Sequence, residues 1–277
     1  MNTGAPKDPL FSIITVCYNS EQTISRTIAS IDGQTFGDWE HIIIDGASTD
    51  NTLSIALDSA SPKRKVYSEP DNGIFDAMNK GISHAKGRYL CFLNSDDALT
   101  NANVLERTSN FAKQDEFELL YGNATIIDEG NYPITIGKMV EAKDYIFGTP
   151  IIHQAVFFRR DLFERYGMYD LNVQGGAADW IWLAKYFRMH LGKTKYLNET
   201  IVDFYRGGAS NRFVWENHLE RIRFAYKYLP YWAFATYIIG AAPVFLKFRV
   251  LRLHKDTWFR RCIRNFKRKV HCVAMKF

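Results

Sequence analysis

The sequence predicts an α/β fold, in which a mostly parallel sheet is flanked by helices. Short apolar runs typical of strands alternate with stretches of helical periodicity over the first hundred residues. These runs are nearly continuous, as expected of strands covered by helices on both faces. Alternation of this kind implies parallel strands joined by right-handed crossovers.

The first two strand–helix pairs occupy residues 11–60. The strand Phe11–Asn19 is rich in Ile and Val, and the next segment places three apolar residues at i, i+4 and i+7: Ile24, Ile28 and Ile31. Ser20 is available to cap this helix. A second buried strand, Trp39–Gly46, precedes a helix over 48–60 whose apolar side is predicted to contain Leu53, Ala56 and Leu57.

Two further strands complete the alternating part. Residues 65–70 read as a third strand, and residues 73–85 have helical spacing through Ile74, Ala77, Met78 and Ile82. The fourth strand, residues 88–93, leads directly into Asn94-Ser95-Asp96-Asp97. Beyond Thr100 the alternation fades into predicted strands at 118–128, 153–160 and 195–206 and an amphipathic helix at 177–190.

Polar residues follow the ends of all four early strands: Tyr18 and Asn19, Asp45, Asp71, and Asn94 to Asp97. Ligands bind beyond the carboxyl ends of the strands in open parallel sheets. We therefore expect these side chains to converge on one crevice.

The pair Asp96 and Asp97 is the most informative of these groups. Mg²⁺ typically takes one or two protein carboxylates and completes its shell with phosphate oxygens and water, and Mn²⁺ accepts similar ligands. Asn94 and Asp96 fit that minimal arrangement. The alternative is that the carboxylates cap a helix that starts near Asn101.

The other strand-end residues allow two interpretations each. Asp45 could bind a nucleotide base or ribose, or could belong to a turn that precedes a capped helix. Tyr18 and Asn19 could form a base-stacking platform or belong to the core. Asp71 and Asn79 are expected to face the same crevice, since Gly73 permits a close turn between them.

Asp179 follows Gly175 and Gly176 and begins an amphipathic helix. It could act as a general base or stabilise the positive end of the helix. His153 and Gln154 could bind a sugar, although a satisfied core histidine is equally compatible with the sequence. The stretch Tyr205–Asn211 reads as a loop with a cation, suited to phosphates, or as a glycine-rich turn.

Charge is distributed unevenly along the chain, whose net value is +5. Residues 247–277 contain 11 Lys or Arg and one acidic residue, so the remainder is acidic. This pattern argues against a nucleic-acid-binding protein and for a tail that meets an anionic surface. Four cysteines without metal-site spacing and an N-terminus without a signal-like apolar segment predict a cytoplasmic protein with free thiols.

The tail begins with an uncharged run, residues 229–246, that is broken by Pro230, Gly240 and Pro243. A basic segment interleaved with apolar residues follows, which is typical of helices lying in a membrane interface. We expect residues 1–228 to form the main domain and 229–277 to attach it to a membrane. The tail could instead pack on the domain, span the bilayer or bind a protein.

The ordered stretches resemble family 2 glycosyltransferases of the inverting, nucleotide-diphospho-sugar-dependent kind, which have the Rossmann-like GT-A fold. The resemblance covers residues 11–211 and includes SIITVCYN, IIIDGASTDNT, EPDNGIFDAMNKG, GRYLCFLNSDD, HQAVFFRR, AADW and GGAS. Within that family, the sequence is similar to the branch that builds bacterial surface polysaccharides such as capsule, colanic-acid-like or O-antigen chains.

The resemblance implies a nucleotide-binding half at about 11–100 and an acceptor half at about 101–228. It implies a donor site lined by seven residues: Tyr18, Asn19, Asp45, Asp71, Asn79, Asn94 and Asp96. Asp96 is the expected ligand of Mn²⁺ or Mg²⁺, Asp179 the catalytic base, and His153 and Gln154 the acceptor or sugar contacts.

The expected reaction transfers a sugar from a UDP- or GDP-linked donor to a saccharide hydroxyl with inversion. The acceptor is expected on a polyprenyl diphosphate, which would place the enzyme as a peripheral or monotopic protein on the inner face of the cytoplasmic membrane.

Three residues depart from the family pattern. Asn94 stands where the metal motif often begins with Asp, Ala178 stands where many relatives have Glu, and Met78 stands where many have Arg. Lys80 could supply the missing phosphate contact. The alternative function is a non-catalytic donor-binding scaffold in a polysaccharide assembly complex. A nucleotidyltransferase or dehydrogenase is disfavoured because no glycine-rich phosphate loop follows the first strand.

Overall fold

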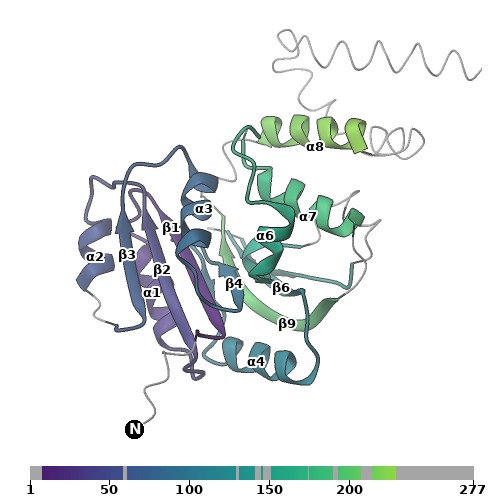
Figure 1. The fold of residues 1–277 in the computed structure, drawn as a ribbon. Helices are drawn as coiled ribbons and strands as arrows, with labels where there is room; N and C mark the ends of the chain where they lie inside the picture. Colours follow the sequence, from purple (N-terminus) through teal and green to yellow (C-terminus); the bar gives the residue numbers. More distant parts are fainter. Residues whose placement is uncertain are drawn as a thin grey trace, which may run out of the picture. The chain divides into compact units, whose positions relative to one another are not determined.

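The first four apolar runs form neighbouring parallel strands in the computed structural model (Figure 1). The structure describes residues 8–58, 61–128, 131–140, 145, 151–173, 175–189, 193–206 and 214–228. The four strands are β1 (Phe11–Cys17), β2 (Trp39–Asp45), β3 (Arg64–Ser68) and β4 (Tyr89–Phe92), in the spatial order β3-β2-β1-β4. Their parallel register pairs Cys17 with Asp45 and Asp45 with Ser68, so the strand ends meet at one edge as predicted.

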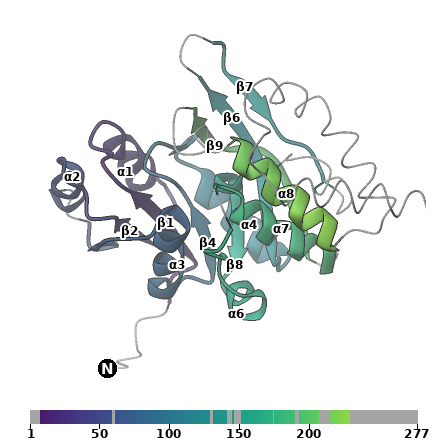
Figure 2. The same ribbon diagram turned by 90° about the horizontal axis from the view of Figure 1, so that it is seen from above.

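Helices cover both faces of this parallel part. Helices α1 (Ile24–Asp32) and α2 (Thr52–Asp58) lie on one face and α3 (Ile74–His84) on the other (Figures 1 and 2). The predicted apolar residues of α1, which are Ile24, Ile28 and Ile31, are all buried. Gly81 lets α3 approach β1 closely, because a Cβ there would lie 2.4 Å from Ile14 Cγ2.

Two details of these helices differ from the prediction. Leu57 is 61% exposed, and Thr52 and Ala56 are the buried residues of α2. The buried side of α2 contains the i, i+4 pair Thr52 and Ala56, and Ile55 packs against the same cluster, so Leu57 faces outward. The side chain of Ser20 does not cap α1; the Ser20 carbonyl accepts the backbone N–H groups of Thr23 and Ile24 instead.

The rest of the sheet is mixed rather than mostly parallel. The order continues β4-β8-β6-β9-β5, formed by β8 (Val156–Arg159), β6 (Leu119–Ile127), β9 (Thr194–Tyr205) and β5 (Ala98–Leu99), with β7 (Ile134–Ile136) paired to β6. Strand β8 runs antiparallel to β4 because the chain enters it from a 3₁₀ turn, η1 (His153–Ala155), beside the carboxyl end of β4. This reversal brings His153 and Gln154 to the edge where the parallel strands end.

Helices α4 (Val104–Gln114), α6 (Asp161–Tyr166), α7 (Ala178–Met189) and α8 (Val214–Tyr228) complete the described elements. Aromatic side chains join α6 and α7 to the sheet. The Phe163 and Trp182 rings stack with centroids 4.8 Å apart, and Phe158 of β8 packs edge-on against Trp182. Since these residues are buried, the packing fixes α7 relative to the strands.

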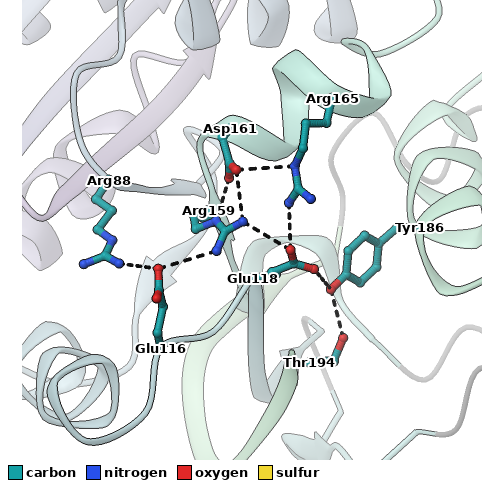
Figure 3. Close-up of polar contacts among 8 residues, drawn as sticks. All are labelled: Arg88, Glu116, Glu118, Arg159, Asp161, Arg165, Tyr186 and Thr194. Atoms are coloured by element: carbon teal, nitrogen blue, oxygen red, sulfur yellow. Dashed lines mark hydrogen bonds and ion pairs between the residues drawn. The ribbon is translucent and has the colours of Figure 1, made fainter. Parts of the chain in front are cut away.

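An ion-pair network links α6 and α7 to the sheet at the end of β8 and the start of β6 (Figure 3). The Glu118 carboxylate accepts hydrogen bonds from Arg159 at 3.1 Å, Arg165 at 2.8 Å and the Tyr186 hydroxyl at 3.4 Å. Arg159 also pairs with Asp161 of α6. Individual exposed pairs stabilise a protein only slightly, but several charges that share partners also fix geometry.

The chain divides into two compact units, Met1–Phe224 and Ala225–Phe277. The predicted membrane-attachment segment, residues 229–277, lies outside the described residues, and the predicted boundary after residue 228 remains a prediction. Within the described ranges, no helix combines the length and the apolar content needed to cross a bilayer.

Candidate active site

The ends of β1 and β2 form a small open surface with an exposed aromatic ring. Tyr18 is 61% exposed, and the Gly46 backbone bonds to the Cys17 carbonyl at 2.9 Å. A Cβ at Gly46 would lie 2.4 Å from an Asp71 carboxylate oxygen and 3.5 Å from the Tyr18 ring. The structure therefore brings Tyr18, Gly46 and Asp71 together, and only glycine fits between the two side chains.

Asp45 lies beneath this surface and is fully buried. Its carboxylate accepts hydrogen bonds from the Ser48 backbone and hydroxyl and from the Ser68 hydroxyl at 2.7 Å. The expectation that Asp45 binds a ligand directly is not supported by this arrangement, because both oxygens have protein donors. Asp45 instead holds the turn that begins at Gly46.

Two residues of these turns have a left-handed backbone, Asn19 with φ 49° and Ala47 with φ 59°. The Asn19 side chain accepts the Thr49 backbone N–H at 2.9 Å, and its own N–H donates to Ser48 at 2.9 Å. Asn19 thus joins the turn after β1 to the turn after β2, and its predicted position at the site edge agrees with the structure.

The segment Asn94–Asp97 is anchored by helix α1. The Thr27 hydroxyl, fully buried, donates to the Asp97 carbonyl at 2.7 Å, and the Arg26 guanidinium donates to the Asp96 carbonyl at 2.7 Å. The Ser95 hydroxyl reaches Ser20 at 2.9 Å. These bonds place the acidic segment next to the turn that carries Tyr18.

Burial raises the pKa of both carboxyl groups in this segment. For Asp97 the pKa is raised well above its ordinary value, first by burial and then by the charge of Asp96, although the Tyr205 backbone N–H donates to it at 3.0 Å. Burial also raises the pKa of Asp96, and nearby Arg26 partly offsets this. A buried acid next to a partly buried one is favourable in its charged form only when a cation lies close to it.

The residues present fit a divalent cation shared with a ligand. The Asn94 side-chain oxygen and one Asp97 carboxylate oxygen are buried without a hydrogen-bond partner, in the segment that also contains Asp96. Over the part of the chain that the structure describes, no three His, Cys, Asp or Glu side chains are grouped to hold a metal by themselves. An amide and a carboxylate instead match Mg²⁺ or Mn²⁺ whose remaining ligands are phosphate oxygens and water.

Asp179 lies in the first turn of α7 and is half-buried. One of its oxygens accepts the Trp180 backbone N–H at 2.6 Å. The turn before it is held from α8, because the Asn217 side chain accepts the Gly176 backbone N–H. Trp180 packs edge-on against Phe224 with ring centroids 5.6 Å apart, which further fixes this end of α7.

His153 and Gln154 connect the acidic segment to Asp179. Both are buried, with exposures of 6% and 5%. Gln154 opposes the rise in the pKa of Asp97, and the Asp179 charge acts on His153 by raising the pKa that burial lowers. The role of His153 and Gln154 as acceptor contacts stays a prediction. Asp97 and Asp179 thus act on two neighbouring residues.

Asn79 and Lys80 also have protein partners instead of open positions. The Asn79 side chain binds both backbone groups of Tyr169, at 2.9 Å and 3.0 Å. Lys80 pairs with Glu69 at 3.0 Å and donates to the Pro70 carbonyl at 2.7 Å. The structure therefore gives no support to Asn79 as a donor contact, nor to Lys80 as a substitute for the arginine absent at Met78.

Sequence reasoning missed three residues at the site: Arg26, Tyr169 and Asn217. Arg26 lies over the Tyr205 ring, 3.6 Å from its centroid, next to the acidic segment. An exposed arginine on a helix has no sequence signal of such a role. Tyr169 and Asn217 act on backbone groups or on side chains from distant segments, which periodicity does not reveal. The stretch Tyr205–Asn211 is described only as far as Arg206.

Comparisons with known proteins agree with one another. The family model described as Glycosyl transferase family 2 matches residues 12–183. A Mycobacterium bovis (strain BCG / Pasteur 1173P2) protein named PGL/p-HBAD biosynthesis glycosyltransferase is 34% identical over 219 residues, 77% of this chain and 84% of the relative. An Escherichia coli protein named UDP-Glc:alpha-D-GlcNAc-diphosphoundecaprenol beta-1,3-glucosyltransferase WfgD is 36% identical over 134 residues, 48% of this chain and 51% of the relative.

Solved structures share the fold at low sequence identity. S. aureus TarS in complex with UDP-GlcNAc superimposes with a TM-score of 0.72 at 18% identity, covering 88% of this chain and 76% of TarS. The mannosyltransferase PcManGT from Pyrobaculum calidifontis, in complex with GDP-Man and Mn²⁺, gives a TM-score of 0.56 at 17% identity, covering 98% of this chain and 87% of that one. The α/β fold predicted from the sequence is thus confirmed as GT-A-like.

Proposed function

The chain belongs to glycosyl transferase family 2, and from that premise we propose that it transfers a sugar from a UDP- or GDP-linked donor to a saccharide hydroxyl with inversion. Family membership makes it a glycosyltransferase of bacterial glycan synthesis. What we propose beyond this is the type of donor, the type of acceptor, the inversion at the anomeric carbon and the dependence on a metal.

One observation supports this function most strongly. Asp97 of the acidic segment and the half-buried Asp179 act electrostatically on the neighbouring buried residues Gln154 and His153, although the two acids come from segments far apart in sequence. A donor site and a base on the two sides of one reacting carbon require such an arrangement.

The nucleotide is proposed to lie against the exposed Tyr18 ring. Gly46 and Asp71 continue this surface, and Asp45 and Asn19 hold its turns from below. An exposed aromatic side chain at a strand end offers stacking area to a base. TarS was solved with UDP-GlcNAc and PcManGT with GDP-Man, which fits either nucleotide here.

The diphosphate is proposed to lie at the acidic segment, with Asp96 and the free oxygen of Asn94 as the metal ligands. A bound Mn²⁺ or Mg²⁺ would neutralise negative charge on the departing nucleoside diphosphate. Asp97 and Arg26 keep the segment in shape, through Tyr205 and the Asp96 carbonyl respectively.

Asp179 is proposed to accept the proton of the acceptor hydroxyl as that oxygen attacks the anomeric carbon. The bond to the diphosphate oxygen breaks on the opposite face, so the configuration inverts in a single displacement. The Asn217 contact and the packing of Trp180 hold the carboxylate in place, which matters because catalytic groups must be positioned precisely.

The acceptor is proposed to be a saccharide on a polyprenyl diphosphate, at the inner face of the cytoplasmic membrane. The name of WfgD specifies a diphosphoundecaprenol acceptor. The basic residues 247–277 are proposed to bind anionic lipid. Removing residues 229–277 is expected to abolish sedimentation with anionic vesicles; continued sedimentation would remove the tail as the anchor.

The decisive experiment is a panel of nucleotide sugars. The full chain with Mn²⁺ or Mg²⁺ should hydrolyse one donor slowly and bind its nucleotide, and chelation of the metal should abolish both. Binding without turnover, even when lipid-linked saccharides are supplied, would favour the non-catalytic scaffold. Neither binding nor turnover with any donor would refute the proposal.

A further inference from the structure

The segment Gly167–Val173 follows α6 and has one buried side chain, that of Tyr169. The Trp182 ring N–H of α7 also donates to the Gly167 carbonyl at 2.7 Å. Tyr169 is 3% exposed, whereas Met168 and Leu171 on either side are 45% and 52% exposed. Gly167 enters the segment with φ 82°, a conformation that favours glycine. The Tyr169 ring packs against Phe75 of α3, Phe92 of β4 and Phe163 of α6.

The backbone of Tyr169 is bound to the donor side of the fold. Asn79 of α3 donates to the Tyr169 carbonyl at 2.9 Å and accepts its N–H at 3.0 Å. Helix α3 starts directly after Asp71, which borders the Tyr18 surface. A side-chain amide that satisfies both groups of one residue fixes that residue in position and orientation.

The hydroxyl of Tyr169 is bound to the other side of the site. It contacts His153 Nε2 at 2.7 Å, and the imidazole stacks on Phe92 with ring centroids 5.0 Å apart. This contact and the stacking on Phe92 fix the orientation of the buried imidazole, and the tautomer decides which of the two groups donates.

Asp179 acts electrostatically on this pair. Burial lowers the pKa of His153, so the imidazole is neutral, and the Asp179 charge opposes that shift. Burial raises the pKa of Tyr169 well above its ordinary value, and the charges of Asp179 and Tyr145 raise it further. The base of the proposed reaction therefore has two buried, neutral, hydrogen-bonding groups close to it.

We propose that Tyr169 is a positioning residue that links the donor-side helix α3 to the surroundings of Asp179, through Asn79 on one side and His153 on the other. This inference rests on the proposed function. In it, Tyr169 touches neither substrate. Its two sets of bonds fix the distance between the two halves of the site and hold the His153 ring in one orientation.

The proposal makes a prediction about pH. The titratable groups that act on His153, among the described residues, are Tyr169 from this segment and Asp179 from α7; β4 and β8 contribute Phe92 and Phe158. Loss of the hydroxyl removes this hydrogen bond from the buried imidazole, so the pKa of His153 should change. Because the charge of Asp179 acts on His153, the acid limb in the pH profile of turnover should shift as well.

The test compares Tyr169→Phe with Tyr121→Phe. Tyr121 is a matched control, because its buried hydroxyl accepts the Val140 N–H at 2.7 Å from β6, outside this cluster. Turnover of the donor found in the panel should fall about ten- to hundredfold in Tyr169→Phe only, and the acid limb of its pH profile should shift in that variant only. Imidazole NMR, with the His153 signal identified by its loss in His153→Gln, should show a changed tautomer or pKa in Tyr169→Phe.

The imidazole signal and the turnover of the two variants test the role of Tyr169 separately. An unchanged His153 signal in Tyr169→Phe would overturn the inference, whether or not the protein has activity. A changed signal with the same activity loss and pH profile in both variants would also overturn it. Absence of turnover and nucleotide binding in the wild type would instead remove the proposed function.

Discussion

Replacing Thr27 with valine should loosen the acidic segment without touching any ligand. The Thr27 hydroxyl is fully buried in α1 and donates to the Asp97 carbonyl at 2.7 Å. Valine has nearly the same shape but no donor, so it leaves a carbonyl unsatisfied in a buried place. Such a loss costs about 1–3 kcal/mol, and the free energy of unfolding should fall by that amount.

The same change should weaken metal-dependent nucleotide binding, because the segment that holds Asn94 and Asp96 loses one of its attachments to α1 and keeps the bond from Arg26. Urea denaturation measures the first effect, and calorimetric titration with UDP or GDP and Mn²⁺ measures the second. Thr108→Val is the control: Thr108 is equally buried, but its hydroxyl bonds to the Val104 carbonyl within α4.

The reasoning would be refuted in either of two ways. Thr27→Val could unfold at the same urea concentration as the wild type, which would mean that the bond contributes nothing. Alternatively, nucleotide binding could fall equally in Thr27→Val and Thr108→Val, which would mean that the loss is general and not specific to the acidic segment.

Three further predictions concern single groups. Asp179→Asn should keep nucleotide binding in calorimetry and lose about 10²- to 10⁴-fold in turnover; robust transfer by this variant would contradict its role as base. Asp96→Ala should abolish the metal dependence of nucleotide binding, and an unchanged metal titration would remove Asp96 as ligand. Burial and Arg64 lower the pKa of His41 to about 3, so below its unfolded pKa near 6.5 the unfolded state binds the extra proton. Stability should therefore decline as the pH falls from about 6.5 toward 3, and His41→Gln should flatten that decline in urea titrations against pH; an unchanged slope would show that other groups cause it.

Much of the fold followed from local pattern. Strands β1 and β2 were predictable because a near-continuous apolar run is typical of a strand that is covered on both faces. Helix α1 was predictable because apolar residues at i, i+4 and i+7 lie on one side of a helix. The antiparallel entry of β8 was not predictable in this way, since it depends on where η1 meets the end of β4. Pairing partners of strands far apart in sequence leave no periodic signal.

The site shows the same division. The rule that ligands gather at the ends of parallel strands predicted Tyr18, Asp71 and Asp96 as site residues. The structure places each of them just after a strand, and their roles stay predictions. Whether such a side chain is open or already bonded could not be read from its position. Asp45, Asn79 and His153 each have protein partners contributed by residues distant in sequence, and those partners decide their availability. Residue type therefore predicted where polar side chains gather better than it predicted which of them are open to a ligand.

The left-handed backbone of Ala47 has a consequence for ligand capture. Such a conformation costs a non-glycine residue about 1–3 kcal/mol, and here the bonds from Ser48 and Ser68 to Asp45 maintain it. A turn already locked in its final shape has little entropy left to lose when a nucleotide arrives. Preference for one base over another would then be altered by exchanging the side chains that this stiff turn presents, while its path through space stays the same.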